Sequence, residues 1–132
     1  MRRRVMLAGM LLAGGSLAAC QREPGAGRAG GEPIRDYDNI PFLGTATVSQ
    51  REDQIQRAAL LRGWVVEARG PRLLRATYTL RRYQAVVEIP YTREGFSIRY
   101  VSSQNMETAP GFVIRDYNQW VDTLQRSIVV GR

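Results

Sequence analysis

Apolar and polar residues alternate along four short segments in the middle of the chain. The segments cover residues 64–68, 74–80, 83–91 and 96–101. Side chains of a strand point alternately to the two faces of a sheet, so a period of two indicates strands with one buried face. The pattern therefore predicts four strands in one antiparallel sheet.

The turns between these segments predict which residues lie opposite one another. A two-residue turn at 81–82 pairs Leu80 with Tyr83, Tyr78 with Ala85, Ala76 with Val87 and Leu74 with Ile89. A four-residue turn at 92–95 pairs Tyr91 with Phe96, Ile89 with Ile98 and Val87 with Tyr100. Both registers gather the large apolar side chains on one face, and Trp64, Val66 and Ala68 join them there. Pro90 donates no ladder hydrogen bond, so we expect it at a bulge or a strand end.

The opposite face of the predicted sheet carries a row of charges that alternate in sign. The row consists of Glu67, Arg75, Glu88 and Arg99, one from each strand. Cross-strand ion pairs at a surface contribute under about 1 kcal/mol each. A surface that holds phosphate or nucleic acid would carry one sign, so we expect a solvated, ion-paired face.

Two segments that flank the strands have a helical pattern. Ser49 and Glu52 fit a capping box for a helix over 50–62 that stops at Gly63. Asp116 can cap a second helix over 117–129, with Gln119 three residues further on. The apolar stripe of this helix consists of Ile114, Tyr117, Trp120, Val121, Leu124 and Ile128. Such a stripe predicts that Trp120 packs on the sheet.

Together these elements predict an α+β fold. We expect a four-stranded antiparallel sheet with two helices on one face, in the order α-β-β-β-β-α. Residues 48–132 would form this small domain, and residues 20–47 would precede it as a tether.

The first nineteen residues have a different pattern. Three arginines at positions 2–4 are followed by an apolar run over 5–19 whose only polar side chain is Ser16. As a helix this run would span about 22 Å, less than the roughly 30 Å of a bilayer's hydrocarbon core. A basic start, a short apolar run and a small-residue end indicate a cleaved signal peptide over 1–19.

The signal peptide ends in Leu17, Ala18 and Ala19 before Cys20, the only cysteine of the chain. These four residues resemble the lipobox of bacterial lipoproteins. In that family a diacylglycerol is attached to the cysteine, the leader is cut before it, and the new amino group is acylated. The resemblance implies that Cys20 attaches the protein to a membrane. The alternative is an ordinary secreted protein with an unmodified thiol, and a single cysteine excludes an internal disulfide.

Gln21 bears on which membrane a lipoprotein with this sequence would be sorted to. In Gram-negative lipoproteins an aspartate at this place usually signals retention in the inner membrane. The resemblance therefore implies the outer membrane, with the domain facing the periplasm.

The segment after the lipobox changes character along its length. Residues 22–32 are rich in glycine and have no apolar period, which is typical of a flexible tether. Its second half is more apolar, with Ile34, Tyr37, Ile40, Phe42 and Leu43. These side chains either cover the domain's own core or form a contact strip for a partner.

The composition limits the chemistry. All 19 basic residues are arginines and histidine is missing, so the commonest general base and metal ligand is not available. Asp116 and Asp122 point in different directions on a helix, and Arg75 separates Glu67 from Glu88. We expect no catalytic residue, no metal and no cofactor. After removal of the leader, sixteen arginines oppose twelve acids, for a net charge of +4. An exported protein of this charge meets no nucleic acid, whereas anionic lipid or lipopolysaccharide stays open as a partner.

Three further motifs lie in the predicted domain. They are Arg62-Gly63-Trp64 after a helix, Ile98-Arg99-Tyr100 with Ser103-Gln104-Asn105-Met106, and Tyr117-Asn118-Gln119-Trp120 leading to Leu124. Over residues 48–130 the chain resembles a group of small, uncharacterised proteobacterial lipoproteins, with Pro90 as a departure from them. The resemblance implies a fold and a location in the cell envelope, and it implies no enzymatic activity.

These features favour a membrane-anchored envelope lipoprotein that presents a small, non-catalytic binding domain in the periplasm. An envelope protein or a glycan is the expected partner. A small-ligand or lipid-binding module and an enzyme are the alternatives. A pocket of at least about 300 Å³ between sheet and helices would favour a small ligand, and a filled core with an apolar surface patch would favour a protein partner.

Overall fold

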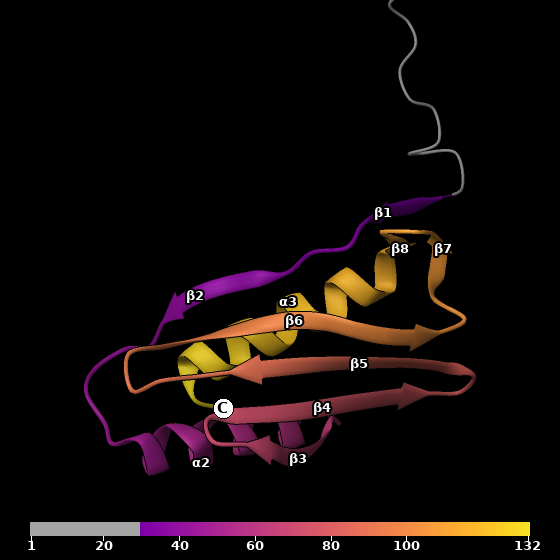
Figure 1. Cartoon of the computed structure of the whole chain (residues 1–132). Coiled ribbons are helices and arrows are strands. Elements are labelled where there is room, and N and C mark those ends of the chain that lie inside the picture. The colour runs from indigo at the N-terminus through magenta and orange to yellow at the C-terminus, as the bar shows by residue number, and fades with distance from the viewer. Residues whose placement is uncertain (1–29) are drawn as a thin grey trace, which may run out of the picture.

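Two antiparallel sheets and two helices make up residues 30–132, the part of the chain that the computed structural model describes. In chain order the elements are β1 (Gly31–Pro33), β2 (Tyr37–Pro41), α2 (Val48–Leu61), β3 (Val65–Gly70), β4 (Leu73–Leu80), β5 (Tyr83–Pro90), β6 (Gly95–Gln104), β7 (Glu107–Ala109), β8 (Phe112–Ile114) and α3 (Arg115–Val130). The larger sheet has the strand order β2-β6-β5-β4-β3, and the smaller has the order β1-β8-β7. Both helices lie behind the larger sheet in Figure 1, which leaves its other face open.

The predicted single sheet of four strands is wrong. The four alternating segments correspond to β3–β6, but β2 adds a fifth strand beside β6, and β1, β7 and β8 form a second sheet. The sequence of β2 is YDNIP, whose Asp, Asn and Pro are depleted in strands. Its pairing with β6 is also irregular between Tyr37 and Ile40. Strands β1, β7 and β8 have three residues each, too few for a period to show.

The predicted register at the centre of the sheet is confirmed. All four predicted pairs between β4 and β5 occur, from Leu80 with Tyr83 to Leu74 with Ile89. Val87 lies opposite Tyr100, and Tyr91 forms a bridge with Phe96. Pro90 ends β5, as expected. Arg81 has φ 57°, the left-handed conformation that a two-residue hairpin turn requires.

The helix starts differ from the predicted ones. The capping box of α2 uses Thr47 and Gln50, not Ser49 and Glu52: the Gln50 amide donates to Thr47 Oγ1 at 3.1 Å, and the Thr47 amide donates to Gln50 Oε1 at 2.8 Å. In α3 the N-cap is Ile114, which gives no side-chain hydrogen bond, and Asp116 lies in the first turn. An acidic residue there still interacts favourably with the helix dipole.

The core lies between the larger sheet and the two helices. Its largest fully buried side chains include Ile55 of α2, Ile89 and Ile98 of the sheet, and the α3 residues Tyr117, Leu124 and Ile128. The N-terminal segment adds to this core, because Phe42 is buried and Ile34, Tyr37 and Ile40 pack against it. These four residues cover the domain's own core and do not form a free contact strip, whereas Leu43 is 68% exposed. Strands β1 and β2 are therefore part of the folded domain, although they lie in the range expected to be tether.

A buried arginine holds the N-terminal segment against α2. Arg51 is 3% exposed, and its guanidinium donates to the carbonyl oxygens of Arg93 at 3.0 Å, Gly44 at 2.8 Å and Leu43 at 3.2 Å. It also lies over the ring of Phe42, with 4.3 Å between Cζ and the ring centre. One side chain thus ties together the loop after β2, the β5–β6 turn and α2.

Candidate functional site

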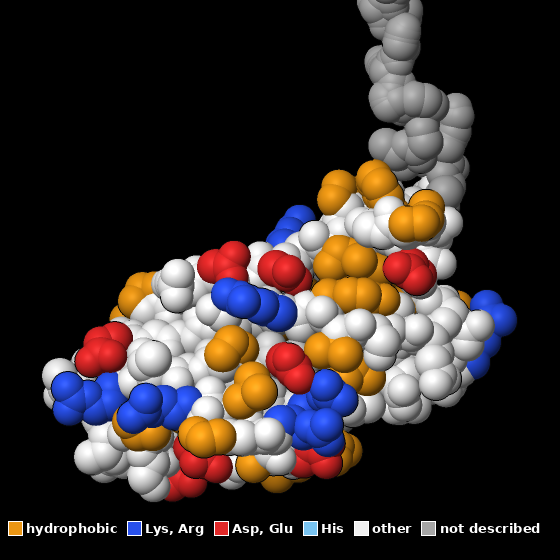
Figure 2. All heavy atoms as spheres, in the orientation of Figure 1, with side chains coloured by type: hydrophobic (Ala, Val, Ile, Leu, Met, Phe, Trp, Pro, Cys, Tyr) orange, Lys and Arg blue, Asp and Glu red, His pale blue; other side chains and the backbone are white. Residues whose placement is uncertain are grey.

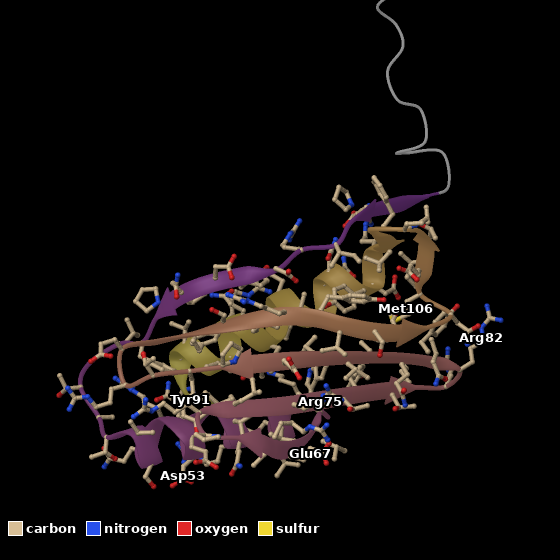
Figure 3. The ribbon with its side chains drawn as sticks, in the orientation of Figure 1. Asp53, Glu67, Arg75, Arg82, Tyr91 and Met106 are labelled. Atoms are coloured by element: carbon tan, nitrogen blue, oxygen red, sulfur yellow. The ribbon has the colours of Figure 1, made fainter. Side chains whose placement is uncertain are left out.

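The open face of the larger sheet carries the predicted row of charges. Glu67 lies opposite Arg75, Arg75 opposite Glu88, and Glu88 opposite Arg99; Figure 3 labels the first two on neighbouring strands. Arg75 donates to Glu88 at 2.8 Å, and Arg99 donates to Asp38 of β2 at 2.9 Å, so the row continues onto the fifth strand. Figure 2 shows blue and red side chains interspersed over this face. The face is ion-paired and has no surface of a single sign.

A groove with a different character lies where α2 and α3 end. A hollow of about 510 Å³ is lined by Arg62, Thr123, Arg126, Ser127, Val130 and Arg132. A smaller hollow of about 130 Å³ is lined by Arg62, Trp64, Tyr78, Trp120 and Thr123. Because Arg62 and Thr123 line both, the two hollows adjoin, and we call them together the arginine–aromatic groove.

The end of α2 places the first two groove residues. Arg62 is the C-cap, and its amide donates to the carbonyl oxygens of Ala59 and Leu60. Gly63 follows with φ 91°, and the Trp64 amide returns to the Ala59 carbonyl at 3.0 Å. A left-handed glycine just past a helix is a common C-terminal cap. This turn directs Arg62 toward α3 and Trp64 into the core.

Three aromatic rings form the wall of the smaller hollow. The Tyr78 ring centre lies 5.4 Å from that of Trp64, with 35° between the planes. The Tyr78 ring centre also lies 4.6 Å from the Trp120 ring centre, with 77° between the two planes. Trp64 is 2% exposed, whereas Tyr78 and Trp120 are partly buried. Trp120 packs on the sheet through Tyr78, as predicted, but it borders the groove and is less buried than Tyr117, Val121, Leu124 and Ile128.

The larger hollow is lined by three guanidinium groups and no acidic side chain. Arg62 Nε donates to Ser127 Oγ at 3.3 Å, and Ser127 Oγ donates to the backbone oxygen of Arg132 at 2.5 Å. Arg126 pairs with Asp122 at 3.0 Å, and Asp122 also accepts from the Tyr37 hydroxyl at 2.8 Å. Among residues 30–132, neither Arg62 nor Arg132 has an ion pair. A guanidinium carries five N–H donors, more than these contacts use.

Two tyrosines hydrogen-bonded to carboxylates are held in the neutral form. Burial raises the pKa of Tyr91 to about 12, with a further contribution from its hydrogen bond to Glu52. Burial and the hydrogen bond to Asp122 raise the pKa of Tyr37. Near neutral pH both hydroxyls are therefore donors and not bases.

The residues that the sequence singled out for membrane attachment lie outside the described part of the chain. They are Leu17, Ala18, Ala19 and Cys20. Within residues 30–132, no group of three or more His, Cys, Asp or Glu side chains could hold a metal ion. The helices of that part are all too short or too polar to cross a membrane.

The groove itself was missed by the sequence analysis. Its residues come from the turn after α2, from β4, and from α3 and the residues just after it, far apart in the sequence, and its polar members follow no period. The one signal in the sequence is Arg62-Gly63-Trp64, which ends α2 and contains two of the groove residues. Comparison of the chain with protein-family models, with curated proteins and with solved structures finds no match.

Proposed function

We propose that the protein is a lipid-anchored lipoprotein of the cell envelope whose domain binds a small anionic ligand in the arginine–aromatic groove. The anchor is Cys20, at the outer membrane, and the domain faces the periplasm. The observation that carries the binding role is the larger hollow, with three guanidinium groups and no acidic side chain on its walls. Its volume of about 510 Å³ is within the range of small-molecule sites, roughly 300–1,000 Å³. It lies at the helix ends, however, and the hollow that reaches the sheet has only about 130 Å³, below the size expected for a small-ligand pocket between sheet and helices.

Arginine is suited to this task. Its planar guanidinium is always charged and presents paired donors that match a carboxylate or a phosphate.

The anchor is tested by metabolic labelling with an alkyne-bearing fatty acid. We expect the native protein to incorporate the label and to fractionate with the outer membrane, and Cys20→Ser to incorporate none. Three acyl chains hold a protein durably, whereas one gives only marginal binding. Equal labelling of Cys20→Ser would rule out the proposed anchor.

The binding role is tested with the mature chain carrying Cys20→Ser and inorganic pyrophosphate as the probe. We expect pyrophosphate to raise the unfolding midpoint of this chain, because a ligand of the native state stabilises it. The shift should be lost in Arg62→Gln and kept in Arg69→Gln, a matched change of an exposed arginine outside the groove. Equal shifts in the two variants would show that the groove is not the anion site.

A second candidate function is the binding of a protein partner. Three apolar side chains around the turn from α2 to β3 are largely exposed: Leu60 at 70%, Leu61 at 68% and Val65 at 70%. Exposed apolar residues grouped in this way favour protein contacts. Photo-crosslinking in living cells from position 61, compared with position 123 in the groove, separates the two: a discrete protein adduct from position 61 alone would favour the partner.

A further inference from the structure

We propose that the ligand of the arginine–aromatic groove is an anionic saccharide, with a sugar ring against Tyr78 and Trp120 and its phosphate or carboxylate against Arg62 and Arg126. This inference rests on the proposed function, because it names the class of anion that the groove takes.

The smaller hollow has the size of one ring. Its volume is about 130 Å³, and an apolar cavity of about 150 Å³ in another protein holds one benzene molecule. Three of its five lining residues are aromatic, and the other two are Arg62 and Thr123. A pyranose matches such walls, since it has apolar C–H faces and hydroxyl groups on one ring. An acyl chain does not, because it would lie against a guanidinium and a hydroxyl that need polar partners.

The geometry of the aromatic wall favours a puckered ring over a flat one. A planar base stacks flat on the face of an aromatic side chain. Here the planes of Tyr78 and Trp120 make an angle of 77°, so the two rings form a corner. A sugar ring can fill a corner with C–H groups on two sides, whereas a planar base covers only one wall of it.

The charge lies next to this corner. Arg62 lines both hollows. Arg126 lines the larger one, and because only its Nη1 pairs with Asp122, at 3.0 Å, its Nη2 is left for a ligand. Arg62 uses its Nε on Ser127 and has no ion pair among residues 30–132, which leaves its terminal nitrogens for a ligand. The nearby carbonyls at the helix ends are already occupied: Ala59 and Leu60 accept from the amides of the α2 cap, and Ser127 accepts from those of Gly131 and Arg132. An anion in the groove therefore meets guanidinium donors and no acidic side chain.

The experiment uses the fact that the protein has two tryptophans, both of which line the smaller hollow. In ¹⁵N NMR spectra of the mature Cys20→Ser chain, the two indole N–H signals report on the hollow directly. The probes are glucose 1-phosphate, glucose, inorganic phosphate, adenosine monophosphate and vesicles of phosphatidylglycerol. We expect glucose 1-phosphate to shift both indole signals and to bind about tenfold more tightly than phosphate or glucose, because the ring and the charge act together.

Matched variants localise the effect. Arg62→Gln should weaken glucose 1-phosphate binding by about tenfold, as expected for loss of a charged hydrogen bond, and Arg69→Gln should leave it within about twofold. Trp120→Phe should weaken glucose 1-phosphate binding without changing phosphate binding. That pattern supports the two-part site.

Other outcomes overturn the inference in distinguishable ways. If inorganic phosphate bound as tightly as glucose 1-phosphate, the sugar ring would contribute nothing to binding, but the proposed anion-binding function would still stand. If adenosine monophosphate bound more tightly than glucose 1-phosphate, the smaller hollow would be a site for a planar base and not for a sugar ring. Indole shifts produced by the vesicles alone would assign the groove to a lipid surface, and the absence of shifts with every probe would refute both the inference and the proposed binding site.

Discussion

Gly63 lies against the ring of Tyr78: a Cβ atom added at position 63 would be 2.8 Å from Tyr78 Cε1. The ring contacts both Trp64 and Trp120, which limit how far it can move aside. Gly63 also has φ 91°, which side-chain-bearing residues rarely adopt. Glycine is thus required at this turn for two separate reasons, and the turn holds one end of the groove.

Gly63→Ala should destabilise the protein by about 2–4 kcal/mol, from the left-handed backbone and the contact with the ring together. Gly44→Ala is the matched control, because Gly44 has φ 68° and nothing within 4 Å of an added Cβ. The control should cost only about 1–2 kcal/mol, for the backbone alone. Urea unfolding measures both, and equal losses would mean that the Tyr78 contact is irrelevant.

Trp120→Ala should cost about 1–2 kcal/mol, less than the roughly 3–5 kcal/mol that full burial of this aromatic residue would imply. The reason is that Trp120 borders the groove and keeps part of its ring in solvent. Leu124→Ala, in the same helix and fully buried, should cost more, about 2–5 kcal/mol. The comparison is made by denaturant unfolding; a larger loss for Trp120→Ala would place this side chain in the core.

Arg51→Met should cost about 3 kcal/mol or more, because the carbonyl oxygens of Leu43, Gly44 and Arg93 lose their donors. Arg51→Lys should not restore stability, since one ammonium cannot reproduce the planar fork that reaches three carbonyls. Arg57→Lys, on the exposed side of the same helix, is the control and should be nearly neutral. Thermal unfolding checks the three variants, and full rescue by lysine would show that charge alone matters.

Stability should fall at alkaline pH through Tyr91. The pKa of Tyr91 is raised to about 12 in the folded protein, above the ordinary value of 10.0. A raised pKa means that its contribution is fully present below about pH 10 and is lost as the pH rises toward about 12. We expect the urea midpoint to drop between these values, with a smaller drop in Tyr91→Phe. An identical pH dependence in the variant would assign the effect to other groups, Tyr37 and Tyr117 among them, whose pKa values are also raised.

The register of the central strands could be predicted because two independent constraints agreed. The apolar alternation and the short turns at 81–82 and 92–95 both put Val87 opposite Ala76 and Tyr100, as found. Each turn length fixes a register, and a slip by one residue would have turned the core face outward. The local sequence was therefore sufficient to predict the register of these central strands.

Elsewhere local chemistry was ambiguous. Thr47 with Gln50 and Ser49 with Glu52 both fit the pattern of a capping box, and the structure forms the first. Arg51 lies on the buried side of α2 with Ile55 and Ala58, but an arginine in a helical stripe looks like a solvent-facing residue. Strand β2 depends on tertiary pairing with β6, since Asp38, Asn39 and Pro41 oppose strand formation locally. The groove could not be predicted because it exists only once α2, β4 and α3 are packed together.

The early start of the domain at β1 sets an upper limit on how far it can travel from an anchor at Cys20. Eleven peptide links join Cys20 to Gly31, and a fully extended chain spans at most about 3.6 Å per residue, or about 40 Å here. A domain that began at residue 48 would have had more than twice that range. If Cys20 is lipidated, the protein samples only a thin layer next to the membrane, and its local concentration there is correspondingly high. A ligand with weak intrinsic affinity can then be held, provided that it is displayed at the same surface.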